Sequence, residues 1–364
     1  MSALDAIQER RRKFVEDLAK RQRKDVEIIV REGALTYLPA KAVLKFRSIC
    51  RDWNLIISNP FFNHKQSHSH RNMSGFFNQS PSGKPSFISL DEAAYGVPDP
   101  SLSFLKVPVD IRSSTNGLLL CQGQTNQLYY VCNPVNKEWT VLPKPSCQHG
   151  TDPAAVIVFE PSVLNFAADY KVICPFASTD FPGATEFEIY SSEKKTWEVS
   201  REICFNQRVQ SGSGIYMNKT IYWTIANGIL AFDPINEHAS AHSNYSTLNA
   251  TLVEMYGRLC YANFKSSKFT VSLVDLYQST MPMNYKGHRT SSKLSIDVDA
   301  NFIGNITHPR VLPSIGGDVF VFLAGERLAS YHAFTGEFKV LSTNMRLSGK
   351  CFPYVNSLVS VSSN

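Results

Sequence analysis

The sequence lacks long apolar runs, and none of its cysteines is paired in a Cys-x-x-Cys motif. No stretch approaches the roughly 20 apolar residues that a membrane helix needs. The first residues are charged rather than apolar, so neither a membrane segment nor a secretory signal is expected. The eight cysteines are scattered, and in such a chain they are expected to be reduced and mostly buried thiols.

Catalytic and metal-binding motifs are missing too. The sequence has no Gly-x-Ser-x-Gly, phosphate loop or His-Glu-x-x-His motif. Candidate cation ligands occur only in small groups: Asp297 with Asp299, His238 with His242, and His64 with His68 and His70. A structural zinc site needs four ligands, and the stretch 237–250 is expected to be a loop. The sequence therefore predicts a protein without catalytic activity, cofactor or metal.

Both the fraction of charged residues and the net charge are modest. Charged residues make up 19% of the chain, hydrophobic residues 43%, and the net charge is +6. These values are typical of globular proteins rather than disordered ones, and nucleic acid is an unlikely partner for so small an excess of positive charge. The length of 364 residues favours two domains or one large one.

Residues 1–24 carry two basic clusters, at 10–13 and 20–24. Such clusters occur in nuclear-import signals and in patches that contact phosphates, and this alternative stays open. Three acidic residues dilute the positive charge: Glu9, Glu16 and Asp17. We therefore favour a solvated helical lead, and we expect the protein in the nucleus, the cytoplasm or both.

The segment 38–57, LPAKAVLKFRSICRDWNLII, predicts a helix that is apolar on more than one face. Pro39 suits the first helical turn, where its missing N–H costs nothing. One apolar stripe has helical spacing: Val43, Phe46, Cys50, Trp53 and Ile57. Other apolar residues fall outside it: Leu44, Ile49, Leu55 and Ile56. A unit of roughly 40 residues rarely buries two such faces by itself, so the rest of the chain or another protein must cover one.

Residues 38–53 and 57–62 resemble the plant F-box motif, Leu-Pro-x-Lys, Leu-x-Phe-(Arg/Lys)-x-Val-Cys-Lys-x-Trp and Ile-Ser-x-Pro-x-Phe in that order. The resemblance implies an F-box over 25–66 that docks on a Skp-type adaptor and, through it, on a cullin–RING ubiquitin ligase. It also implies these adaptor-binding residues: Val26, Leu35, Leu38, Pro39, Ala40, Val43, Leu44, Phe46, Arg47, Ile49, Cys50, Trp53 and Ile57.

The start of the F-box departs from the family pattern. Val26-Glu27 stands where the family has a Leu-Pro pair. The first helix, expected over roughly 26–37, also contains Gly33, and a glycine inside a helix costs about 1 kcal/mol relative to alanine. Asn59-Pro60 predicts the start of a further helix that ends near Gln66, and the polar stretch 67–73 is interpreted as a hydrated linker.

From residue 74 to 364 the pattern changes to short β segments separated by turn residues. Asn227-Gly228 lies between two apolar stretches and predicts a hairpin. A strand–turn–strand repeat opens its last strand at an aromatic or histidine residue: Trp139, Trp197, His238 and Phe338. The gaps are 58, 41 and 100 residues, and the last leaves room for one more copy. A period near 50 favours propeller blades, although a β-sandwich stays open.

The same region resembles the F-box-associated domain of plant F-box proteins, through Ser114–Leu119, Cys132–Pro143, Leu230–Asp233 and Pro353–Ser360. The resemblance implies a small helical F-box followed by a propeller-like domain that holds the target of the ligase. The segment 354–361 is expected to close the ring, and residues 75–364 to fold without the F-box.

The chain is thus expected to be the substrate-recognition subunit of an SCF-type ubiquitin ligase. Its unknown target is expected on long loops such as those of Tyr95, Phe181 and Tyr285. The alternative is a stand-alone β-propeller interaction protein, enzyme or nuclear regulator whose N-terminal helices only pack.

Overall fold

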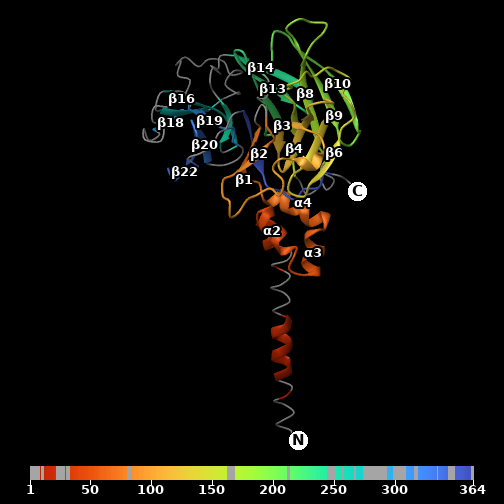
Figure 1. Cartoon of the computed structure of the whole chain (residues 1–364), viewed down its shortest axis with the longest axis vertical. Coiled ribbons are helices and arrows are strands. Elements are labelled where there is room, and N and C mark those ends of the chain that lie inside the picture. The colour runs from red at the N-terminus through yellow and green to blue at the C-terminus, as the bar shows by residue number, and fades with distance from the viewer. Residues whose placement is uncertain are drawn as a thin grey trace, which may run out of the picture.

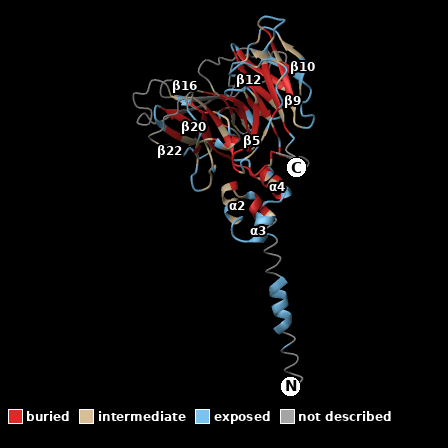
Figure 2. Ribbon diagram, turned by 45° about the vertical axis from the view of Figure 1, so that its right-hand side comes forward, coloured by how far each residue is buried: buried red, intermediate tan, exposed pale blue. Residues whose placement is uncertain are grey.

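The computed structural model describes residues 9, 12–21, 29, 33–79, 83–161, 169–210, 214–243, 251–255, 257–265, 268–273, 293–297, 309–314, 319–333, 335–342 and 349–361. Residues 12–21 form an exposed helix that points away from the rest of the molecule (Figures 1 and 2). Among the described helices, none has the length and apolar character to cross a membrane.

Four short helical segments form a helical module over residues 33–69: η1 (Ala34–Tyr37), α2 (Ala40–Phe46), α3 (Arg51–Ile57) and α4 (Pro60–Ser69). The prediction of one helix over 39–57 is wrong, because the chain turns between α2 and α3. The Ser48 hydroxyl donates to the Lys45 carbonyl at 2.8 Å, and the Ile49 N–H donates to the Phe46 carbonyl at 3.1 Å. Side chains that bond to nearby carbonyls compete with helix continuation in this way.

Helix α4 begins as predicted. Its first residue is Pro60, and the Asn59 side chain accepts a hydrogen bond from the Phe61 N–H at 2.9 Å. The helix continues to Ser69 rather than ending near Gln66. In the region expected to form the first F-box helix, the described structure is the short 3-10 turn η1, preceded by Gly33; the rest of 26–37, apart from Ile29, lies outside the described residues.

The β region consists of antiparallel sheets in sequential order. The first four-stranded sheet contains β3 (Val109–Thr115), β4 (Leu118–Gly123), β5 (Tyr129–Asn133) and β6 (Glu138–Val141). The second contains β7 (Val156–Val158), β8 (Lys171–Ala177), β9 (Thr185–Ser191) and β10 (Thr196–Cys204). The third contains β11 (Ile215–Met217), β12 (Thr220–Ile225), β13 (Gly228–Asp233) and β14 (His238–Ser243).

Two further sheets repeat the pattern, and a smaller one joins the two ends of the region. The fourth contains β15 (Thr251–Met255), β16 (Arg258–Lys265), β17 (Lys268–Leu273) and β18 (Lys293–Asp297). The fifth contains β19 (Arg310–Val311), β20 (Val319–Ala324), β21 (Arg327–His332) and β22 (Phe338–Ser342). The last has three strands in the order β2 (Ser86–Ser89), β1 (Met73–Gln79) and β23 (Lys350–Val355).

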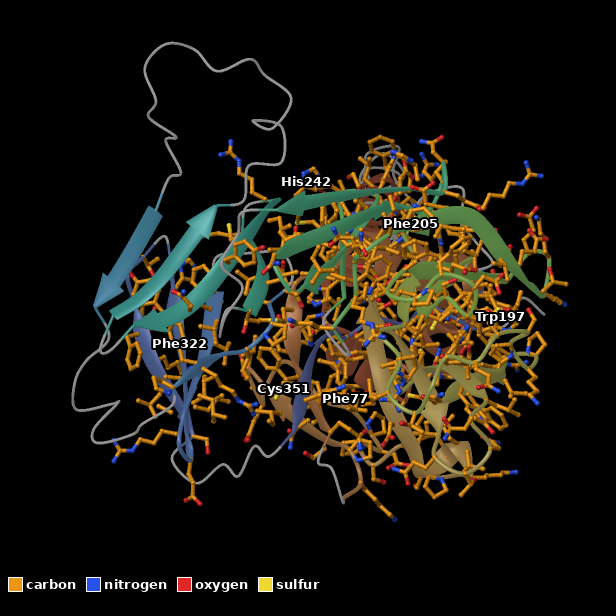
Figure 3. All side chains as sticks on the ribbon, turned by 90° about the horizontal axis from the view of Figure 1, so that it is seen from above. Phe77, Trp197, Phe205, His242, Phe322 and Cys351 are labelled. Atoms are coloured by element: carbon orange, nitrogen blue, oxygen red, sulfur yellow. The ribbon has the colours of Figure 1, made fainter. Side chains whose placement is uncertain are left out.

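The sheets follow one another around a ring, as the view from above shows (Figure 3). Strand β3 contacts β23 on one side and β7 on the other, β7 contacts β11, and β11 contacts β15. Strand β23 pairs antiparallel with β1, so that the last strand of the chain closes the ring beside the first. The architecture is a propeller of five four-stranded blades plus the closing sheet, and the sandwich alternative is wrong. Ring closure is confirmed, although the closing strand spans Lys350–Val355 rather than 354–361.

The predicted repeat corresponds to the outer half of each blade. Trp139, Trp197, His238 and Phe338 each lie within the first two residues of a fourth strand: β6, β10, β14 and β22. The copy expected in the long last gap is the pair β17 and β18. The Asn227-Gly228 hairpin is confirmed, since β12 pairs with β13 across that turn.

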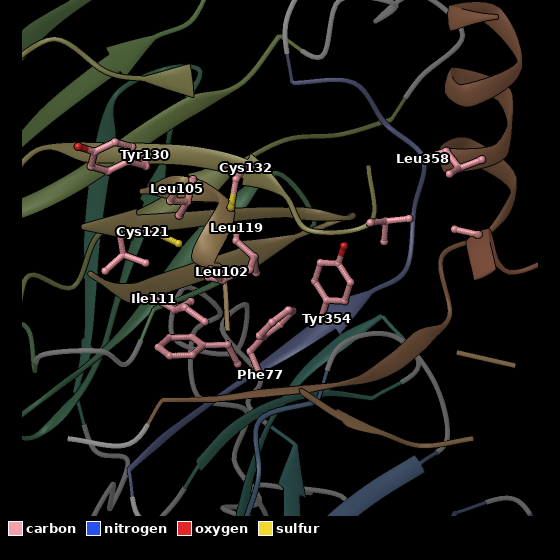
Figure 4. Close-up of a cluster of buried hydrophobic side chains, with 14 of the residues drawn as sticks. Phe77, Leu102, Leu105, Ile111, Leu119, Cys121, Tyr130, Cys132, Tyr354 and Leu358 are labelled. Carbon is pink, nitrogen blue, oxygen red and sulfur yellow. The ribbon is translucent and has the colours of Figure 1, made fainter. Parts of the chain in front are cut away.

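The helical module is packed onto the propeller and is not separated from it by a hydrated linker. One apolar cluster contains residues of both parts: Leu35, Ala40, Val43, Ile57 and Phe62 from the module, and Phe77, Leu119, Tyr354 and Leu358 from the β region. Figure 4 shows the β-region part of this cluster and places Leu358 beside a helix. In the stretch predicted as the linker, Ser67 and His70 are buried. That prediction is wrong because α4 continues into it and its side chains fill the junction.

Candidate protein-interaction site

The helical module presents large apolar side chains to solvent. They are Tyr37, Ile49, Leu55 and Phe61, with 69%, 62%, 62% and 58% of their surface exposed. Leu55 lies in α3 and Phe61 in α4. Tyr37 is the last residue of η1, and Ile49 lies in the turn between α2 and α3. Exposed apolar residues gathered on one small module are typical of a surface that another protein covers.

Four of the predicted adaptor-binding residues are buried within the chain. Leu35, Ala40, Val43 and Ile57 have at most 2% of their surface exposed. Their apolar pattern is accounted for by packing within this chain. The remaining described members are exposed or partly buried: Arg47, Ile49 and Cys50 are exposed, and Leu38, Pro39, Leu44, Phe46 and Trp53 are partly buried. Val26 lies outside the described residues.

Gln66 connects the module to the C-terminal segment. Its side chain is fully buried, and its Nε2 donates to the Leu38 carbonyl at 3.1 Å. Its Oε1 accepts a hydrogen bond from the Leu358 N–H at 3.0 Å. One amide therefore satisfies a donor and an acceptor that come from two distant parts of the chain. This contact fixes helix α4 against the end of the chain.

Asn133 holds the same C-terminal segment to the first blade. Its Nδ2 donates to the carbonyls of Ser357 and Val359 at 2.9 and 2.7 Å. Its Oδ1 accepts from the Tyr354 hydroxyl at 3.2 Å. The segment 356–361 thus forms a clasp between the helical module, the closing sheet and the first blade.

The sequence does not single out the clasp residues as such. Asn133 and the segment 353–360 carry only a resemblance to the F-box-associated domain. A buried glutamine at the end of a polar helix has no distinctive pattern. The signal that points to Asn133 is a polar residue placed directly after an apolar strand and before a proline.

A cavity of about 510 Å³ lies along the inner strands of the propeller. Charged and hydroxyl groups line much of it, including Arg71, Arg112, Glu160, Tyr216, Thr251 and Glu254. Arg112 is held by Asp152 at 2.6 Å, and Asp152 also accepts from Lys350 at 2.6 Å. The cations in this network are therefore compensated by neighbouring carboxylates.

A buried polar network joins the first and second blades. The Glu188 side chain has no exposed surface, and its carboxylate lies 2.6 Å from His149 Nε2. His149 Nδ1 lies 2.9 Å from the Tyr129 hydroxyl. Burial acts to raise the pKa of Glu188, but hydrogen bonds from His149 and Ser146 outweigh it and lower the pKa to about 2. The network stabilises an ionised carboxylate in the interior.

Its sulfur neighbour is unsuited to nucleophilic chemistry. Cys174 lies 3.6 Å from the Tyr129 hydroxyl, and burial raises the pKa of its thiol. A reactive cysteine needs the opposite shift. All eight cysteines are free and five are buried, as the sequence predicted.

The structure describes the histidine groups that were considered as cation ligands. His238 and His242 lie on β14 rather than in a loop, which corrects the prediction for 238–243, while residues 244–250 lie outside the described residues. His64 and His70 are buried in the helical module rather than hydrated. Within the described residues, no three His, Cys, Asp or Glu side chains gather as a metal site would require. Asp299 lies outside those residues.

The three aromatic residues expected on a binding rim have different settings. Phe181 is 44% exposed and makes an edge-to-face contact with Phe205, which is 58% exposed, with ring centroids 5.4 Å apart. Tyr95 lies beside the buried His70, with ring centroids 6.0 Å apart. Tyr285 lies outside the described residues. Of the two members that the structure describes, Phe181 is the more exposed.

Comparison with known proteins places the chain in a family. Residues 100–296 match the family model described as "F-box protein At3g26010-like, beta-propeller". The chain belongs to the F-box protein At3g26010-like β-propeller family. The matched stretch runs from β3 into β18 and covers the first four blades.

Relatives from Arabidopsis thaliana agree with this family. The F-box protein At5g07610 is 34% identical over 69% of this chain and 67% of its own length. The F-box protein At5g49610 is 28% identical over 55% of this chain and 58% of its own length. The putative F-box/kelch-repeat protein At1g15680 is 29% identical over 46% of this chain and 44% of its own length. The matches span between about half and two thirds of these relatives.

Proposed function

We propose that this chain is a non-catalytic substrate-recognition subunit of an SCF-type ubiquitin ligase. In this proposal the helical module docks on a Skp-type adaptor, and the propeller binds the protein to be ubiquitinated. Support comes from membership of an F-box β-propeller family and from the F-box pattern in residues 38–62. The observation that carries it is the exposure of four large apolar side chains on that module, Tyr37, Ile49, Leu55 and Phe61.

The packing between the two parts favours a receptor that holds its target in a defined place. Apolar contacts from Val43 and Ile57 reach the propeller core, and Gln66 ties α4 to the C-terminal clasp. A target on the propeller would therefore be held in a fixed orientation relative to the adaptor. Such an arrangement suits transfer of ubiquitin between two separately bound proteins.

The face opposite the helical module is the place proposed for the target. Strand β1 begins four residues after α4 ends and runs away from the module. The turns that connect β1 to β2 and β4 to β5 therefore lie at the far end of the propeller. With the helices occupied by the adaptor, this face stays free. A nuclear or cytoplasmic location is part of the same proposal.

A binding titration with matched variants tests the adaptor contact. The full chain is titrated against a plant Skp-type adaptor, and the double variant Ile49→Asp/Leu55→Asp is compared with Ile235→Asp. Ile235 is 66% exposed and lies in the turn between β13 and β14, so it provides the same chemical change outside the module. We expect the double variant to bind at least about tenfold more weakly, because two desolvated apolar contacts become buried charges.

The control should bind like the wild type, and all three proteins should have the same melting temperature because exposed positions change stability little. Equal adaptor affinity for the double variant and the wild type would contradict the docking proposal. Absence of adaptor binding by the wild type would favour the stand-alone interaction protein instead.

A further inference from the structure

A groove of about 440 Å³ lies between the closing sheet and the first blade. Its walls come from three connections, represented by Lys84 after β1, Lys106 before β3, and Gln124 after β4. The first and third connections lie at the propeller end away from the helical module, because β1 leaves the module and β4 follows the turn at Gly117, which lies against the clasp residue Ser357. The groove therefore opens on the face that the proposed function leaves for the target.

The walls of the groove are fixed by hydrogen bonds. The Gln79 side chain accepts from the Ile111 N–H at 3.3 Å and donates to the Gly83 carbonyl at 3.4 Å, which ties the first wall to β3. The Gln124 N–H donates to the Pro108 carbonyl at 3.0 Å, which ties the third wall to the second. A site held in this way requires little rearrangement when a ligand binds.

Neither lysine of the groove has a counter-ion among the described residues. Lys84 and Lys106 are exposed, and in the part of the chain that the structure describes neither side chain forms an ion pair or a hydrogen bond. Lys41, by comparison, donates to the Tyr95 carbonyl at 3.2 Å. The two ammonium groups are therefore available to a ligand.

Of the nearby acidic side chains, Asp99 bonds to two serines that line the groove and sets one negative charge against the two lysines. The Asp99 oxygens accept from the hydroxyls of Ser101 and Ser103 at 2.7 and 2.5 Å. The Asp110 carboxylate accepts from Gln124 at 2.8 Å and pairs with Arg112 at 3.3 Å. Since Arg112 and Lys350 together balance Asp110 and Asp152, the groove keeps an excess of positive charge.

We propose that this groove binds a carboxylate-rich segment of the target protein through Lys84 and Lys106. The buried Leu102 and Pro85 give the groove an apolar floor, against which the stem of an acidic side chain can pack. Two lysines on separate walls suit two neighbouring carboxylates of one extended segment. That the ligand is part of a target protein rests on the proposed receptor function. Binding of an acidic peptide to the groove is tested without the adaptor.

The experiment measures fluorescence anisotropy of two labelled peptides of equal length with the full chain. One peptide has four consecutive glutamates, and the other has glutamines at the same places. We expect the wild type to bind the glutamate peptide more tightly, with an affinity that falls as salt is added. In the variant Lys84→Gln/Lys106→Gln that affinity should fall roughly fivefold to thirtyfold, because two exposed ion pairs are lost.

Lys144→Gln is the matched control. Lys144 is exposed in the connection from β6 to β7, which leads into an inner strand at the same face, and it does not line the groove. The control should bind the glutamate peptide like the wild type. Equal affinity of the wild type for the two peptides, or equal losses in the double variant and the control, would overturn the assignment. Adaptor titration of the same double variant reports on the proposed function separately, and it should be unchanged.

Discussion

The side-chain amide of Gln66 accepts a hydrogen bond from the Leu358 N–H at 3.0 Å, although the two residues are 292 positions apart. Through this contact the last helix of the helical module is attached to the last residues of the chain. Because those residues are also bound by Asn133 in the first blade, the module, the closing sheet and the ring depend on one another for stability.

Replacing Gln66 by alanine should therefore destabilise the whole protein. The change leaves the Leu38 carbonyl and the Leu358 N–H buried without their partner, which costs about 1–3 kcal/mol per group. Thermal unfolding of Gln66→Ala should show one transition at a lower temperature. Gln207→Ala is the control, because Gln207 accepts a hydrogen bond from the Thr185 hydroxyl through its backbone carbonyl, which the substitution keeps. A normal melting temperature for Gln66→Ala would contradict the role of the clasp.

Gly117→Ala should weaken the clasp from the other side. Gly117 has a φ of +94°, and a Cβ there would lie 2.5 Å from the Ser357 Cβ. Gly150→Ala is a matched control with a φ of +78° and no atom within 4 Å of the added Cβ. Both variants carry the backbone strain of a positive φ, so the extra loss of stability in Gly117→Ala reports the collision. Equal melting temperatures for the two variants would show that Ser357 moves away freely.

The stability of the protein should fall at acidic pH through Glu188. The pKa of this carboxyl is lowered to about 2 from its ordinary 4.5. A carboxyl with a lowered pKa in the folded state contributes stability that is complete above the unfolded value and is lost as pH falls through the folded value. Chemical denaturation from pH 5 to pH 2 should thus show a steady decrease. Glu188→Gln should be less stable at pH 7 and should lose less between these pH values.

Val43→Ala and Ile49→Ala should separate packing from adaptor binding. Val43 is fully buried in the cluster shared with the propeller, so its truncation should cost about 1–3 kcal/mol of stability. Ile49 is 62% exposed, so its truncation should change stability by less than about 0.5 kcal/mol while weakening adaptor binding. Calorimetry measures the change in stability, and the adaptor titration measures the change in binding. A stable Val43→Ala protein would indicate that the module is only loosely attached.

The propeller was predictable because its repeat is local. The Asn-Gly turn at 227–228 and the residues that open the fourth strands, such as Trp139 and Trp197, give each blade its own signal. The closing strand was predicted for the right end of the chain because an open sheet edge needs a partner. Its register, Tyr354 opposite Gly75, depends on packing that the sequence pattern does not contain.

The helical module was predicted less well because its features depend on distant contacts. The turn after α2 includes a hydrogen bond from the Ser48 hydroxyl. The apolar spacing continues across this turn, so periodicity alone does not reveal it. His70 lies in a polar sequence but is buried, and the ring beside it belongs to Tyr95, from the connection between β2 and β3. Apolar periodicity placed Val43 and Ile57 on an apolar stripe and the F-box resemblance implied that they bind an adaptor, but tertiary structure decides whether the chain itself or a partner covers that stripe.

The most direct test of the whole account is co-purification of the tagged full-length chain from plant cells, followed by identification of the bound proteins. Wild type and the Ile235→Asp control should bring down a Skp-type adaptor together with a cullin, and Ile49→Asp/Leu55→Asp should bring down neither. Recovery of adaptor and cullin in equal amounts with all three proteins would contradict the proposed docking surface. Their absence from the wild-type sample would contradict the assignment of this chain to a ubiquitin ligase.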